Sequence, residues 1–170
     1  MNQLIHYYKL YKIAKNMHNN KSTKVLAAKI GERCIVISLK DKINLHQTTY
    51  HSDEDMINKV DLYDDNKHTA DCKSIDARNE RFGNFSGPSI VNTDYLIFYK
   101  YINIDTDNNI IELPDYFYLI SKNDYINMSK YSKDIRHYID YNIIPFYCIE
   151  NHAKRFDFCK NIDLNHFLLR

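Results

Sequence analysis

The stretch KVDLYDDNKHTADCKSI, which runs from Lys59 to Ile75, decides the fold that we predict for this chain. Residues 59–63 alternate between polar and apolar side chains, as a strand with one buried face does. Residues 64–66 (Asp-Asp-Asn) have turn chemistry, and residues 69–75 have the composition of a second short strand. The sequence therefore predicts a β-hairpin over residues 59–75.

The hairpin brings charged side chains together. Asp61 lies on the first predicted strand, while Asp71 and Lys73 lie two residues apart on the second and so share one face of the sheet. Two carboxylates beside a lysine form an oxygen-rich site that can hold Mg²⁺ and place a cation next to a metal-bound water. Structural roles are the alternative: Asp61 could cap the turn together with Asp64, and Lys73 could protect an edge strand.

Length and composition predict one domain, residues 1–170, with 44% hydrophobic residues to form a single core. The net charge of +1 neither favours nor excludes a polyanionic partner. The four cysteines form no CxxC pair, no apolar N-terminal run resembles a signal peptide, and no apolar run could span a bilayer. We therefore expect reduced thiols, an intracellular location (cytoplasm or nucleus) and no membrane partner.

The charges are distributed unevenly along the chain. The residues before Glu32 include lysines but no acid, whereas residues 53–65 are strongly acidic. Such an uneven distribution is expected of a protein that binds phosphate groups with its basic part and a cation with its acidic part. A solvated helix face and a polar loop would give the same pattern.

Apolar periodicity predicts the other elements. A basic N-terminal helix within residues 1–21 is expected to end near Asn19, and Ser22 is expected to cap a second helix that reaches about Leu39. Further predictions are strands at residues 43–50, 95–104, 116–121 and 143–149, a turn at 105–109, and helices near 129–138 and 159–169. This order predicts an α+β sandwich in which a mixed central sheet of four to six strands is flanked by helices.

Glu32 in a helix, followed by Asp61 and then by Asp71-Cys72-Lys73, resembles the PD-(D/E)xK nuclease superfamily. KIGERCIVISL resembles the first core helix of that family, with its Gly-Glu pair, and VDLYDD and TADCKSI resemble its second and third core strands. The resemblance covers residues 22–121 as a catalytic core, and it implies a restriction-endonuclease-like fold with residues 122–170 as a C-terminal extension. Two departures are Val60, where the family often has proline, and Asp71, where glutamate is more frequent.

The resemblance implies Mg²⁺-dependent hydrolysis of phosphodiester bonds, with Mn²⁺ able to substitute. Asp61 and Asp71 would ligate the metal together with the backbone carbonyl of Cys72. Lys73 would orient the attacking water or neutralise phosphate charge, and Glu32 would support the metal or its water. The alternative for Glu32 is a surface acid on a helix. The implied activity is that of a DNA endonuclease, which we expect to be site-specific (restriction or homing type).

The DNA partner is expected to contact a loop over residues 76–89. Arginine and asparagine can read base edges, and the loop aromatics can wedge or stack between bases. The candidate loop residues are Arg78, Asn79, Arg81, Asn84 and Ser86, and candidates for non-specific phosphate contacts are Lys21, Lys24 and Lys29. A flexible loop whose phenylalanines pack on the core would have the same composition. Cleavage of both strands needs two sites, so we expect a homodimer or a higher even oligomer.

Other functions stay open at this point. A junction resolvase, a non-catalytic module that binds nucleic acid or protein on the same fold, and a structural or host-interaction protein with a tyrosine-rich surface are the alternatives. Zinc binding by Cys148, His152, Cys159 and His166 is disfavoured because their spacing fits no tight zinc knuckle.

Overall fold

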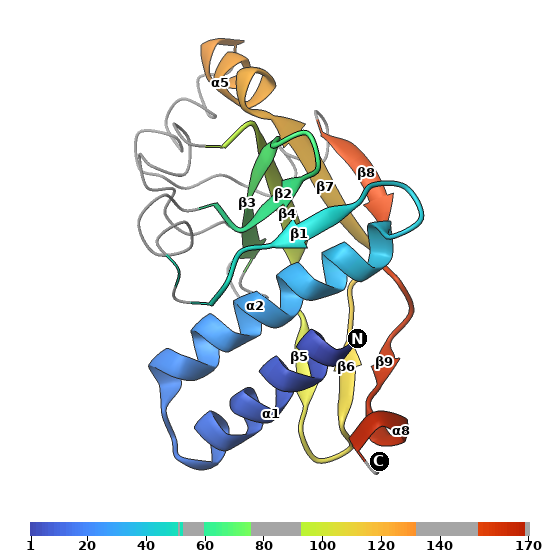
Figure 1. The fold of residues 1–170 in the computed structure, drawn as a ribbon. Helices are drawn as coiled ribbons and strands as arrows, with labels where there is room; N and C mark the ends of the chain where they lie inside the picture. The colour runs from blue at the N-terminus through green and yellow to red at the C-terminus, as the bar shows by residue number, and fades with distance from the viewer. Residues whose placement is uncertain (51, 53–59, 76–92, 132–152, 169–170) are drawn as a thin grey trace.

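The computed structural model describes residues 1–50, 52, 60–75, 93–131 and 153–168. These residues form four helices, a six-stranded mixed sheet and a separate three-stranded sheet (Figure 1). The predicted α+β fold, with a mixed sheet of four to six strands flanked by helices, is therefore confirmed. None of the helices in the described ranges is both long enough and apolar enough to cross a bilayer.

Two N-terminal helices pack against each other, α1 (Asn2–Asn16) and α2 (Asn20–Leu39). The predicted cap of the second helix, Ser22, is wrong. Asn19 caps α2 instead, because its side-chain oxygen accepts a hydrogen bond of 3.1 Å from the Ser22 N–H, which the helix itself leaves without a partner. The end of α2 at Leu39 agrees with the prediction.

The main sheet has the strand order β1-β2-β3-β4-β7-β8. β3 and β4 are parallel, and all the other neighbouring pairs are antiparallel. The strands are β1 (Leu45–Gln47), β2 (Leu62–Asp64), β3 (Thr69–Ile75), β4 (Tyr95–Lys100), β7 (Tyr116–Ser121) and β8 (Lys154–Asp157). β8 comes from the C-terminal segment that we expected to be an extension of the core, so this segment supplies an edge of the main sheet.

The predicted hairpin is confirmed in β2 and β3, where Leu62 pairs with Ala70 and Tyr63 with Thr69. The Asp64 carboxylate holds the turn, because it accepts a hydrogen bond of 2.8 Å from the His68 N–H. Lys67 takes up the positive φ of 65° that lets the chain reverse.

The single strand predicted over residues 95–104 is wrong. The chain leaves the main sheet after Lys100 and begins β5 (Asn103–Asp105), which pairs with β6 (Ile110–Glu112). With β9 (Ile162–Asp163) these strands form the small sheet near α1 (Figure 1). Apolar residues continue through the break, so the sequence pattern does not reveal it.

The C-terminal elements also differ from prediction. α5 (Lys122–Tyr131) begins earlier than the helix expected near residue 129, and Ser121 caps it by accepting a hydrogen bond of 3.1 Å from the Asp124 N–H. The helix predicted over residues 159–169 is wrong, because β9 occupies part of that range and α8 spans only Asn165–Leu168. The strand predicted at residues 143–149 lies outside the described residues.

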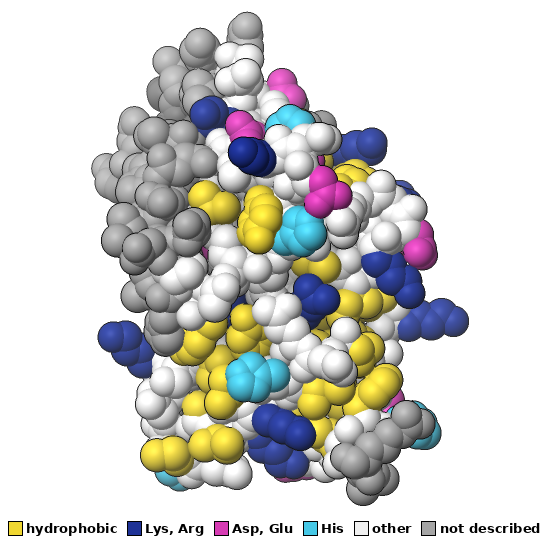
Figure 2. All heavy atoms as spheres, in the orientation of Figure 1, with side chains coloured by type: hydrophobic (Ala, Val, Ile, Leu, Met, Phe, Trp, Pro, Cys, Tyr) yellow, Lys and Arg dark blue, Asp and Glu magenta, His cyan; other side chains and the backbone are white. Residues whose placement is uncertain are grey.

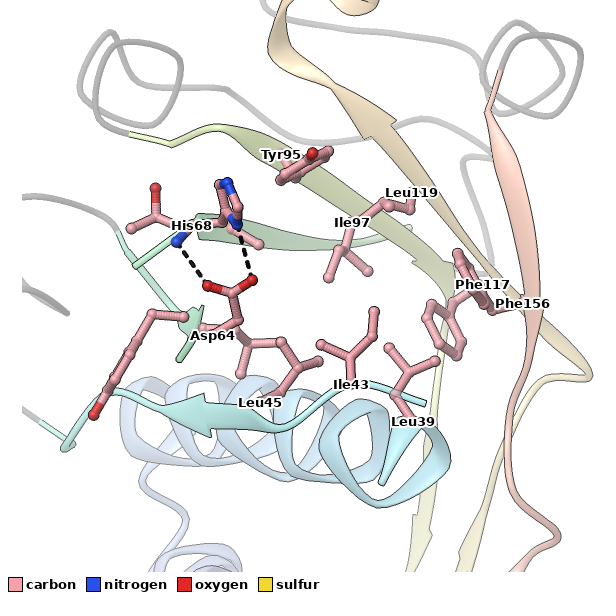
Figure 3. Close-up of a pocket in the computed structure, with 14 residues that line it drawn as sticks. Leu39, Ile43, Leu45, Asp64, His68, Tyr95, Ile97, Phe117, Leu119 and Phe156 are labelled. Carbon is pink, nitrogen blue, oxygen red and sulfur yellow. Dashed lines mark hydrogen bonds and ion pairs between the residues drawn. The ribbon is translucent and has the colours of Figure 1, made fainter. Parts of the chain in front are cut away.

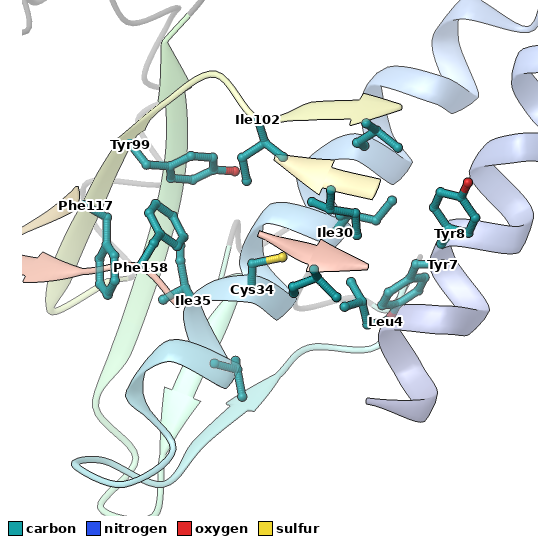
Figure 4. Packing of buried hydrophobic residues seen from close by; sticks show 14 of the residues in the cluster. Leu4, Tyr7, Tyr8, Ile30, Cys34, Ile35, Tyr99, Ile102, Phe117 and Phe158 are labelled. Atoms are coloured by element: carbon teal, nitrogen blue, oxygen red, sulfur yellow. The ribbon is translucent and has the colours of Figure 1, made fainter. Parts of the chain in front are cut away.

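The core lies between α1, α2 and one face of the main sheet. In Figure 4, Tyr7 of α1 points toward α2, where Ile30 and Cys34 lie, and Tyr99 and Phe117 approach from the sheet. All of these side chains are buried. α2 is therefore covered both by α1 and by the main sheet. Charged residues of α2 that face either neighbour are buried.

Gly31 permits the closest approach between α2 and the sheet. A Cβ atom added at this position would lie 2.4 Å from the Tyr99 hydroxyl oxygen and 2.9 Å from the ring carbon that carries it. We expect Gly31→Ala to lower the free energy of unfolding by about 1–3 kcal/mol, the usual cost of overpacking a core, although alanine favours helices. Urea denaturation measures the effect. Tyr99→Phe removes the nearest atom and should recover part of the loss in the double variant, whereas an unchanged or increased stability of Gly31→Ala would contradict this packing.

Candidate metal centre

Asp61 lies immediately before β2, at the open end of the hairpin. Its N–H donates to the Ala70 carbonyl at 3.0 Å, and its Oδ2 accepts a hydrogen bond of 2.7 Å from the Cys72 N–H. Its own carbonyl accepts hydrogen bonds from the N–H and the hydroxyl of Thr48, at 2.9 and 3.3 Å. The Asp61 carboxylate is thus fixed against the backbone of β3, next to Asp71.

Asp71 and Lys73 share one face of β3, as the sequence predicted. The Lys73 Nζ lies 3.2 Å from the Asp71 Oδ2, and Asp71 is only 1% exposed. The Lys73 Nζ also donates a hydrogen bond of 3.5 Å to the Asp71 Oδ1, whereas the buried Oδ2 meets the ammonium only as an ion pair and accepts no hydrogen bond from any described group. An underbonded carboxylate oxygen in a buried position can bind a proton or a cation.

The pKa of Asp71 reflects its burial and the charges of Lys73 and Asp61. Burial raises the pKa of Asp71 to about 7, the Lys73 ammonium opposes the shift, and the charge of Asp61 adds to it. Two carboxylates that repel each other in a buried site favour either a shared proton or a bound cation.

Glu32 approaches Asp61 from α2. It is 3% exposed, and its Oε2 accepts hydrogen bonds from the Lys29 Nζ and the Gln47 Nε2, each at 2.9 Å. Burial raises the pKa of Glu32 well above its usual range, the Asp61 charge raises it further, and Lys29 opposes both effects. The structure therefore rules out the alternative that Glu32 is a solvent-exposed acid on the helix surface.

Cys72 lies between Asp71 and Lys73 in the sequence of β3. The resemblance implies its backbone carbonyl as a metal ligand, and the structure shows that its N–H orients Asp61. Its thiol packs against the hydrophobic core, and burial raises the pKa of this thiol well above its usual range. The side chain is thus unsuited to be a thiolate ligand or nucleophile at neutral pH.

These residues fit a magnesium ion that keeps several of its own waters. No group of three or more His, Cys, Asp or Glu side chains in the described parts of the chain is arranged to hold a metal. Magnesium is commonly bound by one or two carboxylates and completes its octahedron with water and substrate oxygens. Asp61 and Asp71 supply such a pair, and the Asp71 Oδ2 already attracts the positive charge of Lys73 at 3.2 Å.

Only some of the residues that were predicted to contact DNA lie in the described parts of the chain. Lys29 is wrong as a phosphate contact, because it is 2% exposed and its ammonium is paired with Glu32. Lys21 and Lys24 are exposed on α2. On the face shown in Figure 2, the Lys and Arg side chains are scattered and do not form a single stripe. The candidate loop residues Arg78, Asn79, Arg81, Asn84 and Ser86 lie outside the described residues, as do Cys148 and His152 of the disfavoured zinc site.

Sequence reasoning missed Gln47. Its amide donates to the Lys29 carbonyl at 2.8 Å as well as to Glu32, and it is only 9% exposed. One signal was present in the sequence: Gln47 alternates with Leu45 on the inward face of a predicted strand, where an apolar residue is the rule.

A separate pocket lies on the other face of the same strands (Figure 3). Its volume is about 190 Å³, and its walls are mainly apolar side chains such as Ile97, Phe117 and Phe156. Asp64 and His68 also line it, and the His68 Nδ1 lies 2.9 Å from the Asp64 Oδ2. Ala70 lines it, whereas the next residue in β3, Asp71, points to the opposite face. The pocket therefore does not belong to the carboxylate site.

None of the models of known protein families matches this chain, and no curated protein matches it either. The function is therefore inferred from the chemistry of the carboxylates, Lys73 and their surroundings.

Proposed function

We propose that this protein is a Mg²⁺-dependent nuclease that hydrolyses phosphodiester bonds in DNA. The observation that carries the proposal is the Asp71 carboxylate, which is buried beside Asp61 and whose Oδ2 has the Lys73 ammonium as an ion-pair partner but no hydrogen-bond donor among the described residues. A soluble-protein core rarely retains such a group unless a ligand or a reaction uses it.

Each residue of the site would have its own role in the reaction. Asp61 and Asp71 would hold the ion, and the Cys72 N–H keeps the Asp61 carboxylate in place. The chemistry that such an ion would supply is positive charge for the phosphate oxygens and a lower pKa for a bound water. The Lys73 side chain is 26% exposed, so its ammonium can contact both Asp71 and a phosphate group that arrives from solvent. There it would stabilise the negative charge that develops on the phosphate.

Three finer points belong to the same proposal. Site-specific cleavage, of restriction or homing type, would come from the loop that follows Lys73. Cleavage of both strands would need a homodimer or a higher even oligomer. Mn²⁺ is expected to replace Mg²⁺, because both ions accept carboxylate and water ligands.

A plasmid assay tests the proposal. Supercoiled DNA is incubated with the purified protein in Mg²⁺, in Mn²⁺ and in excess EDTA. We expect nicked or linear products with either metal and none in EDTA. A folded protein that binds DNA but does not cleave it with any divalent metal would instead be a non-catalytic binding module. Run-off sequencing of the products from a long DNA then reports the specificity and the stagger of the cut.

A further inference from the structure

Lys29, Glu32 and Gln47 form a buried polar network between α2 and β1. The Glu32 Oε2 accepts two hydrogen bonds, one from the Lys29 Nζ and one from the Gln47 Nε2, each at 2.9 Å. The same Gln47 amide also donates to the Lys29 carbonyl at 2.8 Å. Glu32 is therefore held from its own helix and from the neighbouring strand.

Stability alone does not account for this network. The Lys29 and Glu32 side chains are 2% and 4% exposed, so both charges have lost nearly all of their hydration. A well-packed apolar pair at such a position is often as stable as a buried ion pair, or more stable.

The amide of Gln47 also has an acceptor atom without a partner among the described residues. Its two donated hydrogen bonds fix the orientation of the amide, and its Oε1 is then buried without a hydrogen-bond donor from any described residue. An acceptor of this kind fits an ordered water or the hydration shell of a cation.

The end of β1 and the residue that follows it connect Glu32 with Asp61. Gln47 holds Glu32, and the next residue, Thr48, holds the Asp61 carbonyl through its N–H and its hydroxyl. Gln47, the last residue of β1, and Thr48, which follows it, thus fix the two acids relative to each other, and the Asp61 charge acts on Glu32.

We propose that Lys29 and Gln47 are positioning residues, which hold Glu32 beside Asp61 so that both acids serve the same hydrated cation. This inference rests on the proposed function, because the cation is the one that the nuclease reaction would use. Lys29 and Gln47 both donate a hydrogen bond to Glu32, and they would act on the cation by fixing this carboxylate.

Metal binding without DNA tests the inference. Isothermal titration calorimetry with Mn²⁺ is carried out on the wild-type protein and on Gln47→Met and Lys29→Gln. We expect about 10- to 100-fold weaker binding for each variant, the usual cost of losing a partner that orients a metal ligand. Lys40→Gln, an exposed lysine at the end of α2, is the matched control and should bind Mn²⁺ like the wild type.

A second control separates positioning from folding. Leu4→Ala in α1 removes a fully buried side chain that is not part of the network, so it should lower the melting temperature and leave the Mn²⁺ affinity unchanged. If Lys29→Gln does not fold, Gln47→Met decides the question alone. Wild-type affinity in folded Gln47→Met would overturn the inference and leave the proposed function standing. No Mn²⁺ binding by the wild-type protein would overturn both.

Discussion

Asp71→Asn is expected to abolish metal-dependent DNA cleavage while making the metal-free protein more stable at pH 8. The substitution keeps the shape of the side chain but removes a charge that the ion would need as a ligand. We expect the cleavage rate to fall by about 10²- to 10³-fold or more, as when one electrostatic group is lost at a reacting centre. Opposite effects on activity and stability would mark Asp71 as a residue kept for function.

The gain in stability follows from the pKa of Asp71. This pKa is about 7 in the folded protein and near the ordinary value of 3.8 in the unfolded chain. Between these pH values the unfolded chain has released the proton that the folded protein still binds, so the free energy of unfolding falls as the pH rises from about 4 to 7. One pKa unit corresponds to about 1.4 kcal/mol, so the loss amounts to a few kcal/mol, and Asp71→Asn removes it.

Thermal unfolding in EDTA at pH 5 and pH 8 measures this effect, and the plasmid assay measures the cleavage. The wild-type protein should melt at a lower temperature at pH 8 than Asp71→Asn, and the difference should shrink at pH 5. Asp65→Asn, at an exposed position in the hairpin turn, is the control that should cleave like the wild type. Wild-type cleavage by Asp71→Asn would show that the carboxylate pair is not the active site.

Lys29→Met is expected to lower the free energy of unfolding by about 3–5 kcal/mol at pH 8, the usual cost of removing one partner of a buried ion pair. Without the ammonium, the Glu32 carboxylate stays buried near Asp61 with Gln47 as its remaining hydrogen-bond donor among the described residues. The loss should be smaller at pH 5, because burial and the Asp61 charge already raise the pKa of Glu32, so that a proton can then replace the missing cation.

Chemical denaturation at both pH values tests this second prediction. Lys29→Met/Glu32→Gln should recover most of the lost stability, because it removes the uncompensated charge and keeps an amide that can pair with Gln47. Lys24→Met, at an exposed position on the same helix, should change the stability by less than about 0.5 kcal/mol. Equal stability of the Lys29 and Lys24 variants would show that the buried ion pair contributes nothing.

The sequence by itself determined the elements whose signals are local. The turn residues and the alternation around them predicted the hairpin, and a spacing of two residues was enough to place Asp71 and Lys73 on one face, because strand geometry has a period of two. The end of α2 at Leu39 and the strand at residues 116–121 were also predicted correctly, because their signals lie in the neighbouring residues.

Only the tertiary structure decided which charged residues are buried. Lys29 looks like a solvent-exposed lysine because its sequence neighbours do not show that α1, β1 and the sheet surround α2 on several sides. The break after Lys100 was hidden for a related reason, since Tyr99 before it and Ile102 and Ile104 after it are all buried. Local patterns report whether a residue can be buried, whereas the partner that buries it comes from a distant part of the chain, as Gln47 does for Glu32.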